Sequence, residues 1–258
     1  MRQVIKDFEK YGYFLQELIR RDFHKKYYRS VLGILWTILN PLLMMGIITI
    51  VFSTLFERSI ENYPVYYLCG ILIFNFCKDA SMQSLGALTA NAGLMRKFRL
   101  PVYFFPLSKV ALSLVNFLFS MIPLVLVALF TRAGLHWTFL LFPLPVLLAA
   151  GFTVGLSLAL AAMAVYFRDL NHLYGLVTLA WTYLTPLFYP ISIIPAQWML
   201  LLRFNPMLYY VGIFRALVYE GVLPPVLDWV IAGLFSILTL SGGCLIFHAL
   251  KKGFFLHL

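Results

Sequence analysis

The sequence predicts an all-α integral membrane protein with a single domain at 1–258. Two features of the composition support this prediction: 62% of the residues are hydrophobic, and only 12% are charged. The third observation is a set of long runs without a charged residue, at 31–56, 133–167 and 170–202. A soluble core does not need such runs, whereas a helix that crosses a bilayer needs about 20 apolar residues.

Six spanning helices and several shorter elements are expected along the chain. The first thirty residues are charged and amphipathic, so 1–22 is predicted to be an interface helix on the membrane surface. A polar connector at 90–100, which Pro101 ends, is predicted to be a short cytoplasmic helix. The spanning helices are expected at 31–56, 64–88, 103–131, 138–166, 171–189 and 226–250.

The stretch after the fifth spanning helix cannot be a straight helix, because three prolines occur within ten residues. Non-helical backbone at membrane depth survives only where protein or a water-filled cavity satisfies its polar groups. We therefore expect 190–219 to form two short re-entrant helices on the external side that act as a gate. The candidate gate residues are Pro190, Pro195, Arg203, Asn205, Pro206 and Arg215.

The two arginines of this gate are expected to face water, the pathway or an acidic partner such as Glu220. A bare charge in hydrocarbon would cost at least ~2.5 kcal/mol.

Basic residues in the loops predict the orientation of the chain. One side of the membrane receives fourteen Lys and Arg and the other side receives four, with two more inside or near helices. This bias places both termini in the cytoplasm. The net charge of +10 is divided among separate loops, so a nucleic-acid surface is not expected.

No catalytic or metal-binding residue is predicted. The chain lacks the GxxxxGK[ST], HExxH and GxSxG patterns and has no acidic cluster suited to a metal. Its cysteines, Cys69, Cys77 and Cys244, lie in apolar runs and are interpreted as buried thiols.

Aromatic and hydroxyl side chains form stripes on the second and fifth spanning helices. Rings that alternate with hydroxyls suit sugars, whose C–H faces stack on rings, although ordinary helix packing gives the same pattern. Lys78, with its neighbour Asp79, marks either a pathway or a salt bridge to another helix. The candidate pathway residues are Tyr67, Phe74, Lys78, Tyr174, Trp181 and Phe188.

Three further sets of residues each have two readings. The connector either docks a partner and receives force or is an ordinary basic loop; its candidates are Asn91, Leu94, Arg96, Lys97 and Arg99. The small-residue run at Gly151, Gly155 and Ala159 serves packing within the chain or a dimer seam. A basic cluster anchors the chain to the surface or receives an anionic lipid headgroup; it comprises Arg20, Arg21, Lys25, Lys26 and Arg29.

Three motifs resemble a known family. They are YYRSVLGILWTILNPLL at 27–43, NAGLMRKFRLPVYFFPLS at 91–108, and TPLFYPISIIP with FNPMLYYVGIFRALVYEG at 185–195 and 204–221. The chain resembles, over nearly its whole length, the permease subunits of type-2 ABC exporters for bacterial surface polysaccharides. It departs from the pattern at Leu100, where phenylalanine is commoner.

The resemblance implies a homodimer of permeases in the bacterial plasma (inner) membrane, with two separate ABC ATPase subunits that bind ATP and Mg. It implies export of an undecaprenyl-pyrophosphate-linked glycan of the O-antigen, teichoic acid or capsular type, with 90–100 as the coupling helix and 190–219 as gate helices. Two alternatives remain open at this point: an exporter of drugs or small lipids, and a membrane scaffold or enzyme subunit without transport.

Overall fold

The computed structural model describes residues 2–28, 32–56, 60–98, 100–133 and 136–254, and all regular elements within them are helical. Short 3₁₀ turns and one π-helical turn, Ala216–Glu220, accompany the longer helices. The α-helices are α1 (Arg2–Tyr27), α2 (Leu35–Phe56), α3 (Tyr63–Leu85), α4 (Ala92–Lys97), α5 (Phe104–Phe130), α6 (Pro143–Tyr166), α7 (Leu170–Leu184), α8 (Ala196–Arg203), α9 (Pro206–Arg215) and α10 (Val226–Leu250).

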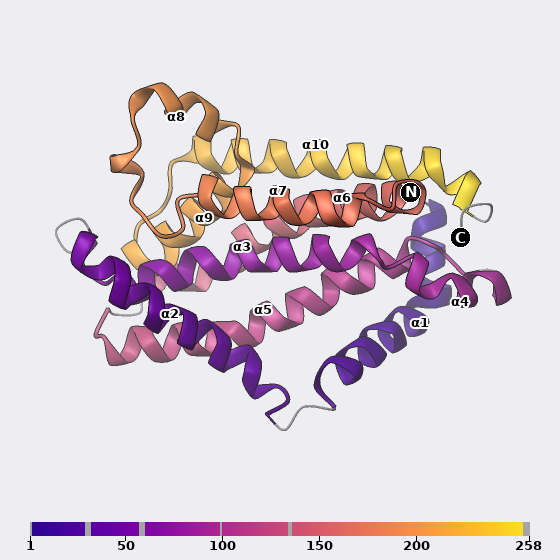
Figure 1. Ribbon diagram of the computed structural model, residues 1–258, viewed down its shortest axis with the longest axis horizontal. Coiled ribbons are helices and arrows are strands. Elements are labelled where there is room, and N and C mark those ends of the chain that lie inside the picture. Colours follow the sequence, from indigo (N-terminus) through magenta and orange to yellow (C-terminus); the bar gives the residue numbers. More distant parts are fainter. Residues whose placement is uncertain (1, 29–31, 57–59, 99, 134–135, 255–258) are drawn as a thin grey trace.

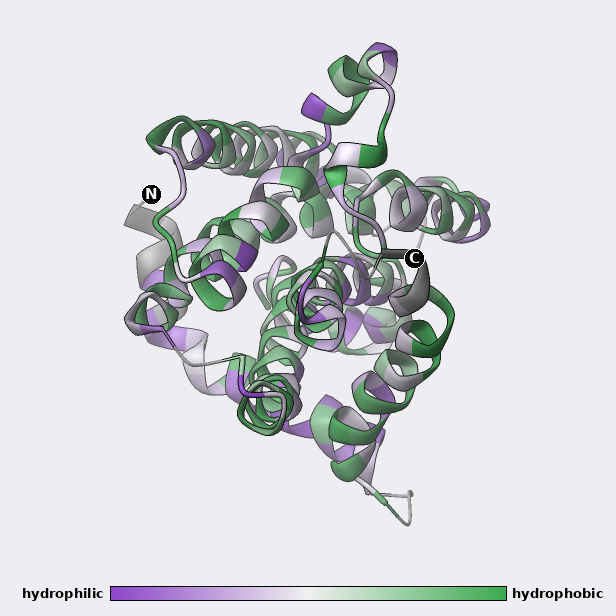
Figure 2. Cartoon of the chain, turned by 90° about the vertical axis from the view of Figure 1, so that its left-hand side faces the viewer, coloured by the Kyte–Doolittle hydropathy of each residue, from purple (hydrophilic) through white to green (hydrophobic). Residues whose placement is uncertain are grey.

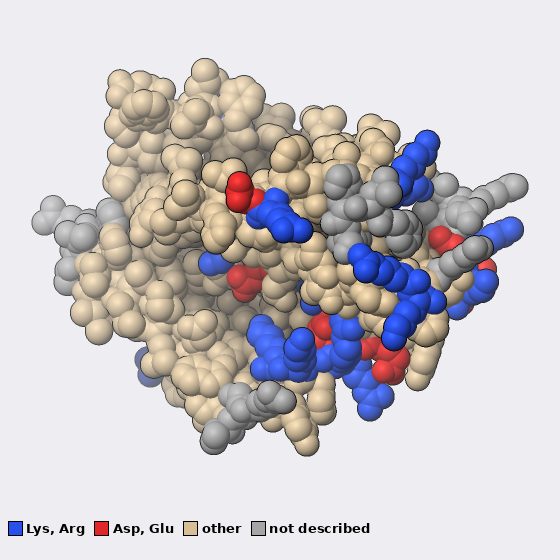
Figure 3. Space-filling view, turned by 45° about the vertical axis from the view of Figure 1, so that its right-hand side comes forward, with Lys and Arg blue, Asp and Glu red and all other residues tan. Residues whose placement is uncertain are grey.

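The long helices form one bundle whose two ends differ in chemistry. In Figure 1, α3, α6, α7 and α10 run side by side, α5 lies beneath them, and both termini lie at the same end as α4. We call this end the basic end, because most of the Lys and Arg side chains visible in Figure 3 lie toward it. The opposite end carries α8, and we call it the α8 end.

Within the described residues, four helical segments are long and apolar enough to cross a membrane: Leu35–Ser53, Phe104–Phe130, Trp137–Tyr166 and Val226–Gly253. Two of the six expected spans are absent from this set. The helix α3 is long enough, with 23 residues, but it carries polar residues such as Asn75 and Asp79. The helix α7 has 15 residues, which gives a length of about 22 Å.

The peripheral helices have an apolar exterior. Figure 2, which views the bundle from the α8 end, shows hydrophobic residues on outer as well as inner helices. Large apolar side chains are exposed along α2, α7 and α10, including Ile47, Leu176 and Leu238. A surface of this kind suits a hydrocarbon environment. Cys244 also lies on the exposed face of α10, so the expectation that all three cysteines are buried is wrong for this one.

The end of α7 follows from its prolines. The helix stops at Leu184, Thr185 has an extended backbone, and Pro186 has no N–H to donate. The expected stop near Pro186 is therefore confirmed, whereas the boundary at residue 189 was placed five residues too late. The end of the interface helix was predicted too early, because α1 continues to Tyr27 rather than ending at residue 22.

The helices α6 and α10 approach each other closely at two glycines. A β-carbon on Gly155 would collide with the backbone of Thr239 and Leu240, and one on Gly243 would collide with the backbone of Gly155. Small residues allow helices to approach in this way. Gly155 is thus used inside the chain, and the hypothesis that it forms a dimer seam is wrong.

Candidate functional site

The basic cluster at the end of α1 is organised by a buried acid. Asp22 is only 7% exposed and accepts hydrogen bonds from Arg21, at 2.9 and 3.1 Å, and from Lys109 Nζ of α5, at 2.6 Å. Arg21 also donates to Asn91 Oδ1 at 3.0 Å. Asp22 therefore joins α1 to α5 directly and, through Arg21, to the connector that follows α3.

Sequence reasoning did not single out Asp22. Two signals could have found it: Asp22 is the only acid in the run RRDFHKKYYR, and Lys109 lies within an apolar helix and needs a partner. The other cations of the cluster are less constrained. Arg20 is exposed and lies 3.8 Å from Glu17, Lys25 is exposed, and Arg29 lies outside the described residues.

A cavity of about 370 Å³ opens beside this cluster. Its lining includes the cations Arg21, Lys25, Lys26 and Lys109, with Asp22 and Asn91 between them. Burial lowers the pKa of Lys26, and the Asp79 carboxylate acts in the opposite direction. The excess of positive charge suits an anion such as a phosphate.

Tyr27 closes the α1 end of the cluster. Its hydroxyl donates to Asn116 Oδ1 of α5 at 2.7 Å. Burial, and secondly the Asp79 carboxylate, raise the pKa of Tyr27 to about 12. The phenol therefore stays protonated at neutral pH and holds the last turn of α1 against α5.

The connector after α3 is anchored on one side and exposed on the other. The 3₁₀ turn Thr89–Asn91 leads into α4, and Asn91 Nδ2 donates to the carbonyl of Ala87 at 2.8 Å. Met95 is buried and Leu94 is half-buried, whereas Arg96 and Lys97 are exposed. The segment thus presents its cations outward from the basic end; Arg99 lies outside the described residues.

Three of the predicted pathway rings, Tyr67, Phe74 and Tyr174, are buried in the core, and Trp181 and Phe188 are half-buried against it. Tyr67 is 2% exposed and stacks on Phe188 at 5.8 Å, and Phe74 is 1% exposed and packs edge-on to Trp181 at 5.8 Å. Tyr174 is buried, and its hydroxyl forms a 2.8 Å hydrogen bond with Ser81. The structure therefore favours helix packing, the alternative interpretation of these stripes.

The polar pair of α3 is not a salt bridge in the described part of the chain. Lys78 is half-buried and Asp79 is exposed, and neither forms an ion pair with a described residue. The salt-bridge interpretation therefore has no support there, and both groups remain available to water or to a ligand.

Asn205 organises the element between α7 and α9. Its Oδ1 accepts from Trp181 Nε1 at 2.8 Å and from the backbone N–H of Met207 at 3.0 Å, which caps α9. Its Nδ2 donates to Thr185 Oγ1 at 3.0 Å. The Asn205-Pro206 break thus fixes the broken end of α7 to the start of α9. Pro190 and Pro195 precede the short helical turns on the way to it.

Arg215 corrects the expectation that both arginines of this element face water, the pathway or an acidic partner such as Glu220. Arg203 is exposed, but Arg215 is only 5% exposed. Its guanidinium lies 3.7 Å above the ring of Tyr66 and fills the space where a β-carbon on Gly70 would lie.

The partners of Arg215 are backbone carbonyls. It donates to those of Pro186 at 2.6 Å, Leu187 at 2.9 Å and Tyr66 at 3.3 Å. The carbonyls of Pro186 and Leu187 lie beyond the last turn of α7 and have no helical partner. Arg215 therefore satisfies the irregular backbone that the prolines create.

An apolar helical bundle with an amphipathic first helix, a basic end and a broken element at the other end defines a polytopic membrane protein. The chain belongs to the ABC-2 type transporter family, whose profile matches residues 13–219.

Curated relatives extend this likeness over most of the chain. It is 29% identical to the O-antigen export system permease protein RfbA of Myxococcus xanthus, over 98% of both chains. It is 30% identical to a protein of the same name from Klebsiella pneumoniae, over 82% of this chain and 83% of the relative. The polysialic acid transport protein KpsM of Escherichia coli is 23% identical, over 92% and 93% of the two chains.

Proposed function

We propose that this chain is the permease subunit of an ATP-driven exporter that moves a lipid-linked polysaccharide across a bacterial plasma membrane. The cargo would be of the O-antigen, capsular or teichoic acid type. The observation that carries the proposal is the likeness to the O-antigen export permease of Myxococcus xanthus over 98% of both chains. The basic cavity beside α1 supports it, because a pyrophosphate-linked lipid presents an anion at the membrane surface.

The working unit in this proposal is a homodimer of permeases with two ABC ATPase subunits. The partners bind ATP and Mg, and the glycan is carried on undecaprenyl pyrophosphate. The exposed cations Arg96 and Lys97 dock the ATPase, and closure of the ATPase dimer pushes on α4 and α1. Because Asp22 joins α1 to α5, that push reaches the bundle.

A strain that lacks this chain tests the proposal. We expect surface polysaccharide to be lost and lipid-linked glycan to accumulate inside, with both restored by the wild-type chain. An ATPase variant that binds but does not hydrolyse ATP should give the same phenotype. Normal surface glycan with an altered sensitivity to small toxic compounds would instead favour an exporter of drugs or small lipids and overturn the proposal.

In the proposed orientation the basic end is cytoplasmic and the α8 end is external. Single cysteines at Leu200 and Phe98, which are exposed at opposite ends, test it in a chain whose own cysteines are replaced. An impermeant thiol reagent added to intact cells should label the cysteine at position 200 and spare that at 98. The reverse pattern would invert the topology.

A further inference from the structure

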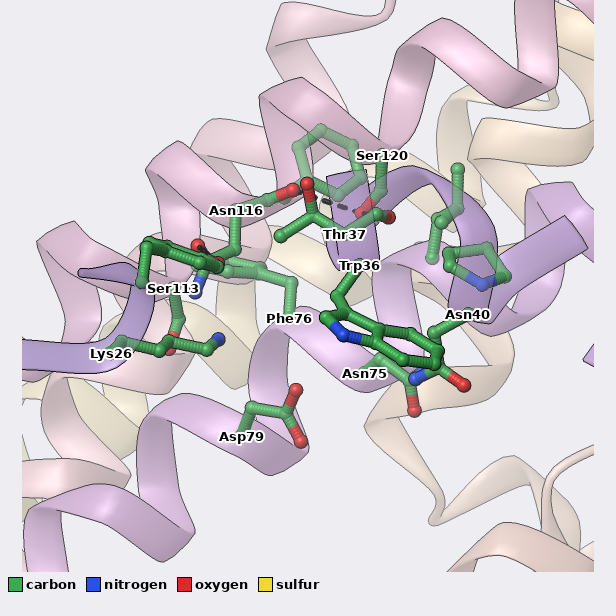
Figure 4. A pocket seen from close by; sticks show the side chains of 14 residues that line it. Lys26, Trp36, Thr37, Asn40, Asn75, Phe76, Asp79, Ser113, Asn116 and Ser120 are labelled. Atoms are coloured by element: carbon green, nitrogen blue, oxygen red, sulfur yellow. Dashed lines mark hydrogen bonds between the residues drawn. The ribbon is translucent and has the colours of Figure 1, made fainter. Parts of the chain in front are cut away.

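A second cavity, of about 330 Å³, lies between the end of α1, the first turns of α2 and the middles of α3 and α5. Figure 4 shows its lining. The Trp36 ring lies beside Asn40 and Asn75, and Lys26 and Asp79 lie together on the other side of the cavity. This volume is at the small end of ligand sites, which suits one or two small rings rather than a polymer.

Two of the amides that line this cavity lie far from the ends of their helices. Asn75 is ten residues from the last residue of α3, Leu85, and Asn116 is twelve residues from the first residue of α5, Phe104. At 1.5 Å per residue these positions are ~15 and ~18 Å from the ends of their helices at the basic end. Polar side chains at such positions are costly and typically face a cavity with a function.

Most of this hydrogen-bonding capacity is unused. Asn116 Oδ1 accepts from Tyr27, but its Nδ2 has no partner among the described residues. Within the described chain, the amides of Asn40 and Asn75 and the carboxylate of Asp79 also form no hydrogen bond, and the ammonium of Lys26 lies 5.3 Å from the centre of the Tyr27 ring. Amides and a carboxylate can donate to and accept from several hydroxyl groups at once.

The ring of Trp36 supplies the apolar half of the site. Its side chain is half exposed and lines the same cavity as the three amides. An aromatic face beside amide and carboxylate groups matches a pyranose, which has C–H faces and a rim of hydroxyls. A bare lipid phosphate would leave the amides unpaired and would face the negative charge of Asp79.

Lys26 connects this cavity to the basic one, because it lines both. We propose that the two cavities form one site for a glycosyl phosphate: the first sugar of the lipid-linked glycan binds between Trp36 and the amides, and its phosphate binds at Lys26. The inference rests on the proposed function for the nature of the cargo. It adds a sugar-selective site between the basic cavity and the middles of α3 and α5, apart from the aromatic stripes of α3 and α7.

Binding of synthetic probes to the purified permease–ATPase complex tests the site. The probes are farnesyl diphosphate that carries one N-acetylglucosamine, farnesyl diphosphate alone, and soluble N-acetylglucosamine 1-phosphate. We expect the first to bind roughly tenfold more tightly than either of the others, since several hydrogen bonds and the lipid add to the phosphate. Equal binding of the first two, or binding of neither, overturns the proposal; equal binding of the soluble sugar phosphate overturns the lipid-linked assignment.

Variants separate the two halves of the site. Asn75→Ala and Trp36→Leu should each remove most of the tenfold preference and leave the affinity for farnesyl diphosphate unchanged, whereas Lys26→Gln should weaken both lipid probes. Unchanged sugarless binding also shows that the variants are folded. The matched control is Asn171→Ala, an exposed amide on α7, which should behave as wild type.

Probe binding tests the sugar site and glycan export tests the proposed function, so a failure of one can be distinguished from a failure of the other. If Asn75→Ala and Trp36→Leu both keep the wild-type preference, the sugar site is wrong, while restoration of export by the wild-type chain still supports the proposed function. If a strain without the chain exports glycan normally, the proposed function is wrong, whatever the probes show.

Discussion

The two ends of this bundle each attach a peripheral element to the central helices, and they do so in opposite ways. At the α8 end, Arg215 is buried and donates only to backbone carbonyls. At the basic end, Asp22 is buried but its partners Arg21 and Lys109 are charged and partly exposed. The first attachment joins one guanidinium to carbonyl dipoles, which carry no titratable group, and the second is an ion network in contact with water.

The difference has a physical reason. Carbonyls freed by Pro186 have no water to bond to inside the protein, so an internal donor must satisfy them. The end of α1 lies at a surface in contact with water, where a charged group loses little hydration and where screening weakens the attraction between charges. We therefore expect the α8 end to resist change and the basic end to respond to salt, to charge and to a partner.

The largest loss of stability is expected from Arg215→Met. The change leaves the carbonyls of Pro186 and Leu187 without a donor and opens the space above Tyr66, so we expect about 3–5 kcal/mol of destabilisation in detergent. Arg215→Lys should recover only part of it, because an ammonium cannot reproduce the planar fork. Thermal unfolding measures both, with Arg203→Met at an exposed site as the control. A loss no greater than that of the control would show that Arg215 is dispensable.

Asp22→Asn should cost less, about 2 kcal/mol, because it leaves Lys109 without a counter-charge at a site that is only partly exposed. The double variant with Lys109→Met should be more stable than Asp22→Asn alone, since it removes the unpaired charge as well. Chemical unfolding of the single and double variants gives the coupling. Simple additivity of the two changes would contradict the pairing.

Asn205→Ala should cost about 1–2 kcal/mol. It removes the cap of α9 and leaves Trp181 Nε1 without its acceptor. Asn171→Ala, at an exposed amide, should stay within ~0.5 kcal/mol of wild type. An increase in the solvent exposure of Trp181, seen as a red-shifted fluorescence, should accompany the first change only; equal spectra for the two variants would rule out the predicted link.

The smallest effect on stability, and a large one on function, is expected at the connector. Charge reversal of Arg96 and Lys97 should change stability by less than ~0.5 kcal/mol, because both side chains are exposed. It should nevertheless abolish co-purification with the ATPase or uncouple hydrolysis from transport. Reversal of Lys251 and Lys252 makes the same change of charge elsewhere at the basic end and should be tolerated. If both double variants fail alike, overall charge rather than docking is responsible.

Local features of the sequence predicted much of the fold. Charge-free runs located the apolar helices, and Pro186 located the end of α7 within two residues. Two short helices were expected within 190–219, and α8 and α9 lie there, on either side of the break at Asn205-Pro206. These features depend on the backbone chemistry of a few neighbouring residues, so a single sequence contains them.

The partners of polar side chains were not predictable in the same way. Arg215 finds its acceptors 149, 29 and 28 residues away in the chain, and Asp22 finds Lys109 87 residues away. Neither pairing has a periodic signature. The ring stripes of α3 and α7 were visible, but whether a ring faces a pathway or another ring depends on how two helices rotate against each other, which the pattern alone does not specify.

The contact between Gly155 and Gly243 bears on how the bundle can move. Because the backbones of α6 and α10 touch there, neither helix can roll past the other without a collision. We expect α6 and α10 to move together as one rigid unit, so the change between the resting and transporting conformations must occur in other helices. The helix α7, short and exposed along most of its length, and the outer helix α2 are the elements with room to shift. A bulky side chain at position 155 would therefore loosen the frame against which the moving helices work.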